Sequence, residues 1–265
     1  MDALKADALN IGYQEELIVK ELYMSIPRGK VTVMIGANGC GKSTILKALG
    51  RILQPRKGTV YLNGADIHHL STLEVAKQMA ILPQSVQAPE GLTVGDLVSY
   101  GRYPHKKGFG ALSGEDYEIV DWALGITNLS DLTCVPVDTL SGGQRQRAWI
   151  AMAIAQKTDV ILLDEPTTYL DLSYQLEVLE LLKHLNEVNG YTIGMVLHDI
   201  NLAARHADYM IAIKNGRILE EGTPEEIMTR EVLMKTYQID AQIVMDQRTG
   251  RPICLSYDLV KTEEV

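Results

Sequence analysis

A glycine-rich loop followed by a lysine and a hydroxyl side chain is the most specific chemical pattern in the sequence. Residues 36–44, Gly-Ala-Asn-Gly-Cys-Gly-Lys-Ser-Thr, satisfy GxxxxGK[ST] and lie between a β-branched run and a helical pattern. Such a loop turns its backbone N–H groups toward phosphate oxygens at the positive end of a helix dipole. We expect Lys42 to reach the β- and γ-phosphates and Ser43 to ligate Mg²⁺. The pattern predicts a nucleoside triphosphate site, and the alternative is a glycine-rich turn that binds nothing. The expected loop contacts are Asn38, Gly39, Cys40, Gly41, Lys42, Ser43 and Thr44.

Polar side chains also follow two predicted buried strands. The apolar run 160–163 ends at Asp164 and is followed at once by Glu165. Such a pair can divide its work, Asp164 holding Mg²⁺ through water and Glu165 polarising an attacking water. The run 192–197 ends at His198, and because the carboxyl ends of parallel strands meet at one crevice, His198 would contact the γ-phosphate. An acidic turn and a structural histidine are the plainer interpretations.

The segment Leu-Ser-Gly-Gly-Gln at residues 140–144 separates this chain from other phosphate-loop proteins. Ser141 with Gln144 three residues later is a capping box, which predicts a helix that continues past Trp149. Arg145 and Arg147 fall in its first turns, where the helix dipole disfavours cations. We interpret this placement as a sign that an anion binds there, with helix capping alone as the alternative.

The elements that must position these residues alternate between strands and helices. A helical stretch from Thr93 to Ile126 interrupts the alternation, and a turn-rich tail begins near Pro224. Alternating strands and helices predict an α/β fold with a mainly parallel, three-layer core. Strands are expected over 31–35, 59–62, 80–82, 160–163, 192–197, 239–244 and 252–257, helices over 43–52 and 175–186, and hairpin turns at Asn63-Gly64 and Asn215-Gly216.

Composition excludes several classes of protein. The chain has 265 residues, 46% hydrophobic and 22% charged, which is typical of a folded globular protein rather than a disordered or disulfide-dependent one. Its net charge of −9 argues against a binder of nucleic acid. The three cysteines form no CxxC pair, which favours a reducing compartment. No apolar run approaches the length of a membrane span and the amino terminus has no signal-peptide pattern, so any membrane role is expected to be peripheral.

Taken together in order and spacing, these motifs resemble an ATP-binding-cassette ATPase over nearly the whole chain to about residue 225. Gln84 and Tyr169-Leu170-Asp171 complete the resemblance. It implies a phosphate-loop core with an amino-terminal antiparallel β layer and an inserted helical subdomain. The implied boundaries are 1–86 and 156–223 for the core, 87–155 for the helical subdomain and 224–265 for a carboxy-terminal extension.

The resemblance also implies roles for individual residues. Two copies would sandwich two ATP molecules head to tail, the signature residues of one copy capping the γ-phosphate held by the other. Glu165 would be the general base with Lys42 and His198 as further catalytic groups, and Asp171 would lie at the dimer contact. Tyr13 would stack on adenine. The implied γ-phosphate cap is Ser141, Gly142, Gly143 and Gln144, and the implied Mg²⁺ ligands are Ser43, Gln84 and Asp164.

A narrower resemblance points to cassettes that drive import of ferric siderophores and related iron complexes. It is carried by residues 81–84, 90–94, 101–105, 145–153, 166–171 and 198–204. It implies membrane permease subunits contacted through Gln84 and the segment 85–105, an indirect extracytoplasmic binding protein and a peripheral place at the cytoplasmic face of the membrane. Haem or cobalamin importers, a cassette acting outside transport, a non-hydrolysing regulatory module and an exporter subunit remain alternatives.

Two further features suggest chemistry that we weigh against simpler interpretations. His68, His69 and His105 lack ligand partners at metal spacing, so we predict no iron site. Cys40 lies inside the phosphate loop beside a helix amino terminus. We hypothesise that modification of its thiol blocks ATP binding, and the alternative is a small residue in a small space.

Overall fold

The structure is a computed structural model that describes residues 1–14, 16–84, 88–106 and 111–260. Contacts divide the chain into two compact units. The first unit contains residues 1–69 and 194–265, and the second contains residues 70–193. Strand β8 (Thr192–Val196) begins in the second unit and ends in the first.

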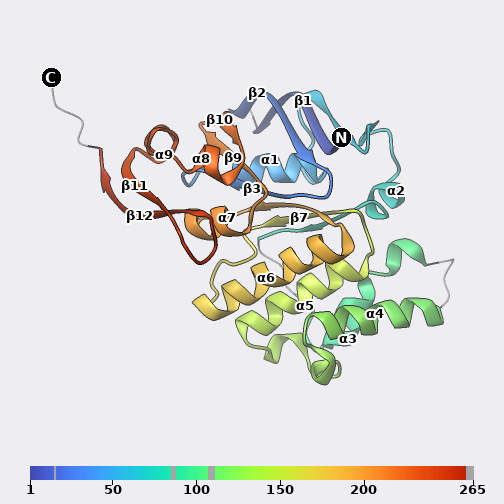
Figure 1. The fold of residues 1–265 in the computed structure, drawn as a ribbon. Helices are drawn as coiled ribbons and strands as arrows, with labels where there is room; N and C mark the ends of the chain where they lie inside the picture. Colours follow the sequence, from blue (N-terminus) through green and yellow to red (C-terminus); the bar gives the residue numbers. More distant parts are fainter. Residues whose placement is uncertain (15, 85–87, 107–110, 261–265) are drawn as a thin grey trace. The chain divides into compact units, whose positions relative to one another are not determined.

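The first unit begins with an antiparallel sheet in the order β2-β1-β4-β5. Its long hairpin consists of β1 (Asp2–Tyr13) and β2 (Glu16–Pro27), and β4 (Lys57–Leu62) turns into β5 (Ala65–Asp66). Helix α1 (Lys42–Leu49) packs its apolar face against β1 and β2 (Figure 1). This is the predicted antiparallel layer, and Asn63-Gly64 forms the predicted hairpin turn with both residues at positive φ.

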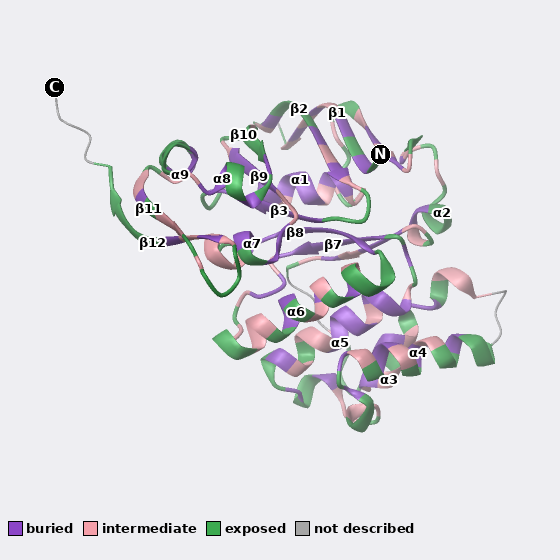
Figure 2. Ribbon diagram, viewed as in Figure 1, coloured by how far each residue is buried: buried purple, intermediate pink, exposed green. Residues whose placement is uncertain are grey.

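The strands that carry the phosphate loop lie in the same unit. Strand β3 (Val31–Ile35) pairs in parallel with β9 (Tyr209–Lys214), which turns at Asn215-Gly216 into the antiparallel β10 (Arg217–Gly222). All five residues of β3 are buried (Figure 2). The end of β8 lies beside β3, because the Leu197 N–H donates to the Met34 carbonyl at 3.3 Å. Helix α7 (Ile200–His206) follows β8.

The described part of the carboxy-terminal extension, residues 224–260, belongs to the first unit. It comprises α8 (Pro224–Ile227), α9 (Arg230–Tyr237) and a hairpin of β11 (Ile239–Met245) with β12 (Pro252–Leu259). Helix α9 contacts β9, β10 and β11, and α7 contacts β12. The two predicted tail strands are therefore confirmed.

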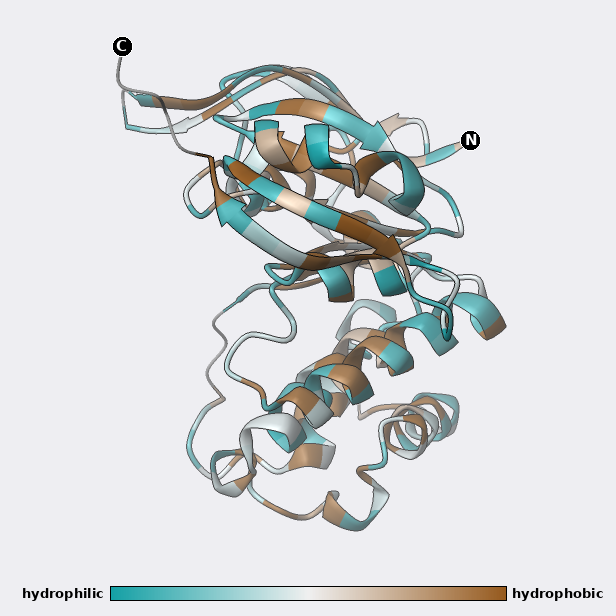
Figure 3. Ribbon diagram, turned by 60° about the vertical axis from the view of Figure 1, so that its left-hand side comes forward, coloured by the Kyte–Doolittle hydropathy of each residue, from teal (hydrophilic) through white to brown (hydrophobic). Residues whose placement is uncertain are grey.

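The second unit combines a parallel strand pair with helices. Strands β6 (Met79–Leu82) and β7 (Val160–Asp164) are parallel, and the Thr192 N–H at the start of β8 donates to the Asp159 carbonyl. Hydrophobic (brown) and hydrophilic (teal) segments alternate along the helices of the second unit in Figure 3, as expected for amphipathic helices. These helices are α2 (Thr72–Ala76), α3 (Val94–Tyr100), α4 (Gly114–Ile126), α5 (Gly142–Ala155) and α6 (Leu172–Asn189), with 3₁₀ turns η1 (Tyr103–His105), η2 (Ser130–Leu132) and η3 (Val137–Thr139).

The α/β fold class, the parallel strands and the helical insertion are confirmed, whereas some helix bounds differ from prediction. The predicted helix 43–52 ends at Leu49, because Gly50 caps it and Arg51 has a φ of +60°. Helix α6 extends beyond the predicted 175–186 and ends where Gly190 adopts a left-handed conformation. The proposed boundary at Gln87 lies outside the described residues. Within the described part of the chain, no helix has both the length and the apolar character needed to cross a membrane.

Candidate functional site

The phosphate loop lies where β3 ends and α1 begins. Gly36, Gly39 and Gly41 have positive φ values of 150°, 76° and 106°, which only glycine adopts readily. The space around Gly36 is also closed, since a Cβ atom there would lie 2.2 Å from the Ile213 carbonyl oxygen. Ala37, Asn38 and Gly39 are exposed, whereas Cys40 is buried. The loop therefore presents its central backbone to a ligand.

Lys42 is poised for an anion. Its side chain is 5% exposed and folds back along the loop, with Nζ donating to the carbonyl oxygens of Gly36 at 2.7 Å and Ala37 at 3.0 Å. The Cys40 Sγ lies 3.8 Å from Nζ. Among the described residues, none of the ion pairs involves Lys42. A buried ammonium held only by neutral groups fits a phosphate, because the anion supplies the missing charge.

His198 belongs to the same unit as this loop and follows the strand β8. Its neighbour Leu197 is hydrogen-bonded to Met34, two residues before Gly36, and the His198 side chain is exposed. Asp199 caps α7 by accepting from the N–H groups of Asn201 at 2.8 Å and Leu202 at 2.9 Å. The backbone on both sides of His198 is therefore held in place, by the hydrogen bond of Leu197 before it and by the helix cap of Asp199 after it.

Tyr13 ends β1 opposite Glu16 at the tip of the long hairpin. Its side chain is 45% exposed, so the ring is accessible to a planar ligand. Its role in adenine stacking stays a prediction.

The predicted carboxylates lie together in the second unit. Asp164 is the buried last residue of β7, and Glu165 follows it at a φ of +52°. The Gln84 Nε2 atom donates to Glu165 Oε2 at 2.6 Å, and Thr168 Oγ1 donates to the same oxygen at 3.0 Å. This meeting of Gln84 and Glu165 follows from the parallel pairing of β6 with β7, since Leu82 lies opposite Leu163. The Gln84 amide oxygen is a donor of the kind that Mg²⁺ prefers, and its role as a metal ligand stays a prediction.

The signature segment opens α5 as predicted. Ser141 accepts from the Gln144 N–H at 3.3 Å while Gln144 Oε1 accepts from the Ser141 N–H at 3.0 Å, which completes the capping box. Ser141 and Gly142 are exposed. Gly143 is buried for a packing reason, because a Cβ atom there would lie 2.7 Å from the Tyr174 ring of α6.

The structure gives Arg145 and Arg147 partners within their own unit, and the anion that we inferred from their placement stays a prediction. Arg145 Nη2 donates to the carbonyl oxygens of Asp138 at 3.0 Å and Leu140 at 3.2 Å. Arg147 Nη1 lies 3.6 Å from Glu177 Oε2 on α6. Both cations therefore have partners in their own unit that account for their positions.

Asp171 begins α6 as its N-cap residue, and its carbonyl oxygen accepts from the Gln175 N–H at 3.0 Å. Its neighbour Tyr169 has a φ of +64° and is 95% exposed. The segment from Tyr169 to Asp171 is therefore an exposed turn, and its place at a dimer contact stays a prediction.

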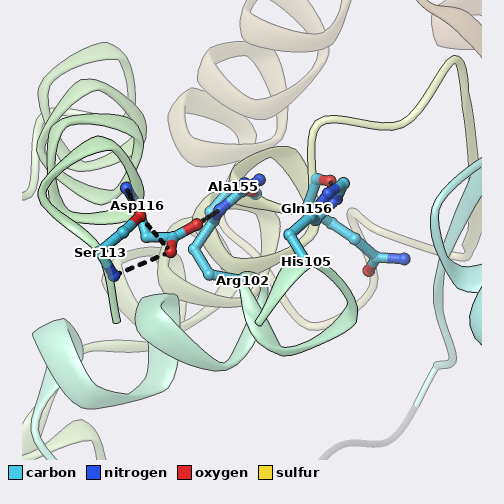
Figure 4. A network of polar contacts seen from close by, with 6 residues as sticks. All are labelled: Arg102, His105, Ser113, Asp116, Ala155 and Gln156. Carbon is cyan, nitrogen blue, oxygen red and sulfur yellow. Dashed lines mark hydrogen bonds and ion pairs between the residues drawn. The ribbon is translucent and has the colours of Figure 1, made fainter. Parts of the chain in front are cut away.

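Part of the segment expected to contact membrane subunits has a structural role instead. Arg102 is buried, and Figure 4 shows it between α4 and α5. Its Nε donates to Asp116 Oδ1 at 2.9 Å and its Nη1 to the Ala155 carbonyl at 2.8 Å. His105 Nε2 lies 2.8 Å from the Gln156 carbonyl oxygen. Of the predicted contact segment, residues 85–87 lie outside the described residues.

The same segment nevertheless exposes an aromatic pair. The rings of Tyr100 and Tyr103 lie 5.0 Å apart, and their side chains are 39% and 54% exposed. Lys106 Nζ lies 5.5 Å from the Tyr103 ring centre. Exposed aromatic side chains of this kind are common at protein interfaces.

Two residues of the site were not predicted. Thr168 orients Glu165, and a hydroxyl three residues after a carboxylate is a local signal that could have indicated it. Tyr237 contacts the phosphate loop, since its hydroxyl accepts from the Gly36 N–H at 2.8 Å. No sequence pattern links positions 201 residues apart, so only the fold reveals this contact.

Comparison with known proteins decides the family. The family model described as ABC transporter matches residues 19–168, more than half of the chain. The chain belongs to the ABC transporter family. Members of this family bind and hydrolyse ATP, so the phosphate loop is its ATP-binding loop and the chain is an ABC-type ATPase.

Individual ABC relatives extend the match over the full length. The chain is 56% identical over 264 residues to the iron(3+)-hydroxamate import ATP-binding protein FhuC of Bacillus subtilis (strain 168), covering 100% of this chain and 98% of the relative. It is 45% identical to the ferric enterobactin transport ATP-binding protein FepC of Escherichia coli (strain K12), covering 94% and 92%. A solved metal-chelate type ABC transporter in an inward-facing conformation matches with a TM-score of 0.82 at 29% identity, covering 96% of this chain and 98% of that one.

Proposed function

We propose that this chain is the ATP-hydrolysing subunit of a membrane importer that takes up ferric siderophores. The full-length similarity to import subunits for iron(3+)-hydroxamate and ferric enterobactin carries the proposal. Two copies would bind two ATP molecules and act on permease subunits from the cytoplasmic face of the membrane. The exposed Tyr100–Tyr103 pair supports a protein contact in that region.

In the proposed reaction, Glu165 accepts a proton from the attacking water. The donors Gln84 and Thr168 both approach its Oε2 and hold the carboxylate in place for that step. Lys42 neutralises charge on the β- and γ-phosphates, and His198 contacts the γ-phosphate. Tyr13 stacks on adenine. Ser141, Gly142 and Gly143 of the second copy close over the γ-phosphate at the start of α5, because the first N–H groups of a helix have no backbone partner within the helix.

The residues also fit a magnesium ion. Ser43, Gln84 and Asp164 offer hydroxyl, amide and carboxylate oxygens, which are the hard donors that Mg²⁺ prefers. The bound ion would neutralise charge on the transferred phosphate.

Transport assays test this function directly. Uptake of labelled ferric hydroxamate, ferric enterobactin, haem and cobalamin is measured in cells that carry the wild-type chain or Lys42→Ala. We expect loss of ferric-siderophore uptake alone, because Lys42→Ala removes the buried cation of the ATP loop. Loss of haem or cobalamin uptake instead would reassign the cargo, and unchanged uptake of all four would contradict an import role.

A further inference from the structure

The carboxy-terminal extension touches the ATP-binding loop through one hydroxyl group. Tyr237 is the last residue of α9, far beyond the 19–168 region that the family model matches. Its hydroxyl accepts a hydrogen bond of 2.8 Å from the N–H of Gly36, the first residue of the loop. Tyr237, which lies outside the ABC motifs, therefore binds the backbone of the ATP-binding loop.

Gly36 is the point at which the loop is most constrained. Its carbonyl oxygen accepts from Lys42 Nζ at 2.7 Å, so a single residue binds Tyr237 through its N–H and the ATP-binding lysine through its carbonyl. The backbone there has a φ of +150° and no room for a side chain. Loss of the N–H partner would therefore free the residue that holds Lys42.

The environment of the tyrosine suits an acceptor that never ionises. Burial raises the pKa of Tyr237 well above its usual range, and the nearby Cys40 and Asp199 raise it further. The hydroxyl keeps its proton at physiological pH and accepts through a lone pair. Asp199, whose charge contributes to this pKa shift, directly follows His198 in the sequence.

The helix that carries Tyr237 is anchored on both sides. Thr229 caps its start by accepting from the Val232 N–H at 3.2 Å, and Lys214 Nζ on β9 donates to the Lys235 carbonyl. At its end the Gln238 carbonyl accepts from the Val260 N–H at 3.2 Å, which ties the helix to the strand β12. The hydroxyl is thus held in place by the fold of the extension.

We propose that Tyr237 is a positioning residue that makes the carboxy-terminal extension part of the ATP site, by fixing Gly36 and with it the carbonyl that aligns Lys42. The inference rests on ATP binding by the loop, and it does not depend on which cargo the transporter carries. It gives the segment 224–265 a role in nucleotide affinity.

The test replaces Tyr237 by Phe, which keeps the ring and removes the acceptor. We expect ATP to bind about tenfold more weakly, because a loop that has lost the Tyr237 contact must be ordered when ATP binds, and a tenfold loss corresponds to about 1.4 kcal/mol. Hydrogen exchange at the Gly36 amide should become faster, and the loss should be larger in the KM for ATP than in kcat, since Tyr237 itself does not contact reacting groups.

The matched control is Tyr209→Phe. Tyr209 hydrogen-bonds to Glu221 and pairs with Thr32 at the opposite end of β3 from the loop. It should lose a comparable hydrogen bond but keep wild-type ATP affinity and Gly36 exchange. Unchanged ATP affinity in Tyr237→Phe, or an equal loss of affinity in both variants, would overturn the proposal. Failure of siderophore import in cells with normal ATP binding would affect only the proposed cargo.

Discussion

Glu165 occupies an unfavourable backbone conformation at the end of β7. Its φ of +52° lies in the left-handed region, where a residue with a Cβ atom is disfavoured by roughly 1–2 kcal/mol. Strain of this kind is kept where a side chain must point in a set direction. Here the conformation delivers the carboxylate to the donors Gln84 and Thr168.

A pair of substitutions measures this strain. Glu165→Ala and Glu165→Gly both remove the carboxylate and should both abolish ATP turnover. The glycine variant should have a free energy of unfolding about 1 kcal/mol higher than the alanine variant, because glycine adopts positive φ without a steric penalty. Urea denaturation of both proteins makes the comparison, and a more stable alanine variant would show that the conformation is not strained.

Single residues differ in how well they could be predicted. Short sequence patterns predicted the positions of Lys42 after the glycine-rich loop, Ser141 at the start of a helix and Glu165 at the end of a strand, because the geometry of each pattern is local. The partners of Arg145 and Arg147 could not be predicted, because Asp138 and Glu177 lie in a different turn and a different helix. Tyr237 has no local pattern at all.

At the level of elements, one buried ion pair joins α4 to the rest of the helical region. Arg102 and Asp116 have side chains that are 6% and 9% exposed, and Ser113 donates to Asp116 through both its N–H and its hydroxyl. These hydrogen bonds, with the charge of Arg102, lower the pKa of Asp116 from 3.8 to about 2. Ionised Asp116 is therefore favoured in the folded state.

Asp116→Asn should destabilise the protein by about 3 kcal/mol at pH 7, because the buried Arg102 loses its counter-charge. The stabilisation in the wild type exists above the unfolded pKa of 3.8 and is lost as the pH falls through about 2. The difference between the two proteins should therefore shrink between these values. Denaturation curves at several pH values test this, with Asp121→Asn on the exposed face of α4 as the control. A difference that does not change with pH would contradict the assignment.

The two glycines at the start of α5 have different tasks. A Cβ atom at Gly143 would meet the Tyr174 ring at 2.7 Å, whereas one at Gly142 would meet only Leu170 Cδ2 at 3.8 Å. Gly143→Ala should lower the free energy of unfolding by about 1–3 kcal/mol, since α5 and α6 must separate. Gly142→Ala should change it by less than about 0.5 kcal/mol and reduce ATPase activity instead. Equal stability of the two variants would mean that Gly143 is not a packing residue.

At the level of the whole chain, local sequence patterns predicted where strands occur but not which strands pair with one another. The strands over 31–35, 59–62 and 160–163 were each expected from β-branched or apolar runs. The pairing of β1 with β4, and of β3 with β9 across more than 170 residues, depends on side chains distant in sequence. The residues that we assign to ATP hydrolysis are found in both units: the ATP loop and His198 belong to the first, and Gln84, Ser141 and Glu165 belong to the second.

The proposed head-to-tail homodimer predicts that two inactive variants can restore activity to one another. If Lys42 of one copy and Ser141 of the other serve the same ATP, then Lys42→Ala and Ser141→Arg each inactivate both sites of their own homodimer. In a mixed dimer, the wild-type loop of the Ser141→Arg copy meets the wild-type Ser141 of the Lys42→Ala copy, which restores one site. A mixture of the two inactive proteins should therefore regain ATPase activity, roughly a quarter of the wild-type value if copies exchange freely and sites act independently. A chain that carries both substitutions is the control, because its mixture with either parent cannot form an intact site. If the mixture stays as inactive as that control while ATP still drives dimer formation, each site is built from a single copy and the composite arrangement is wrong.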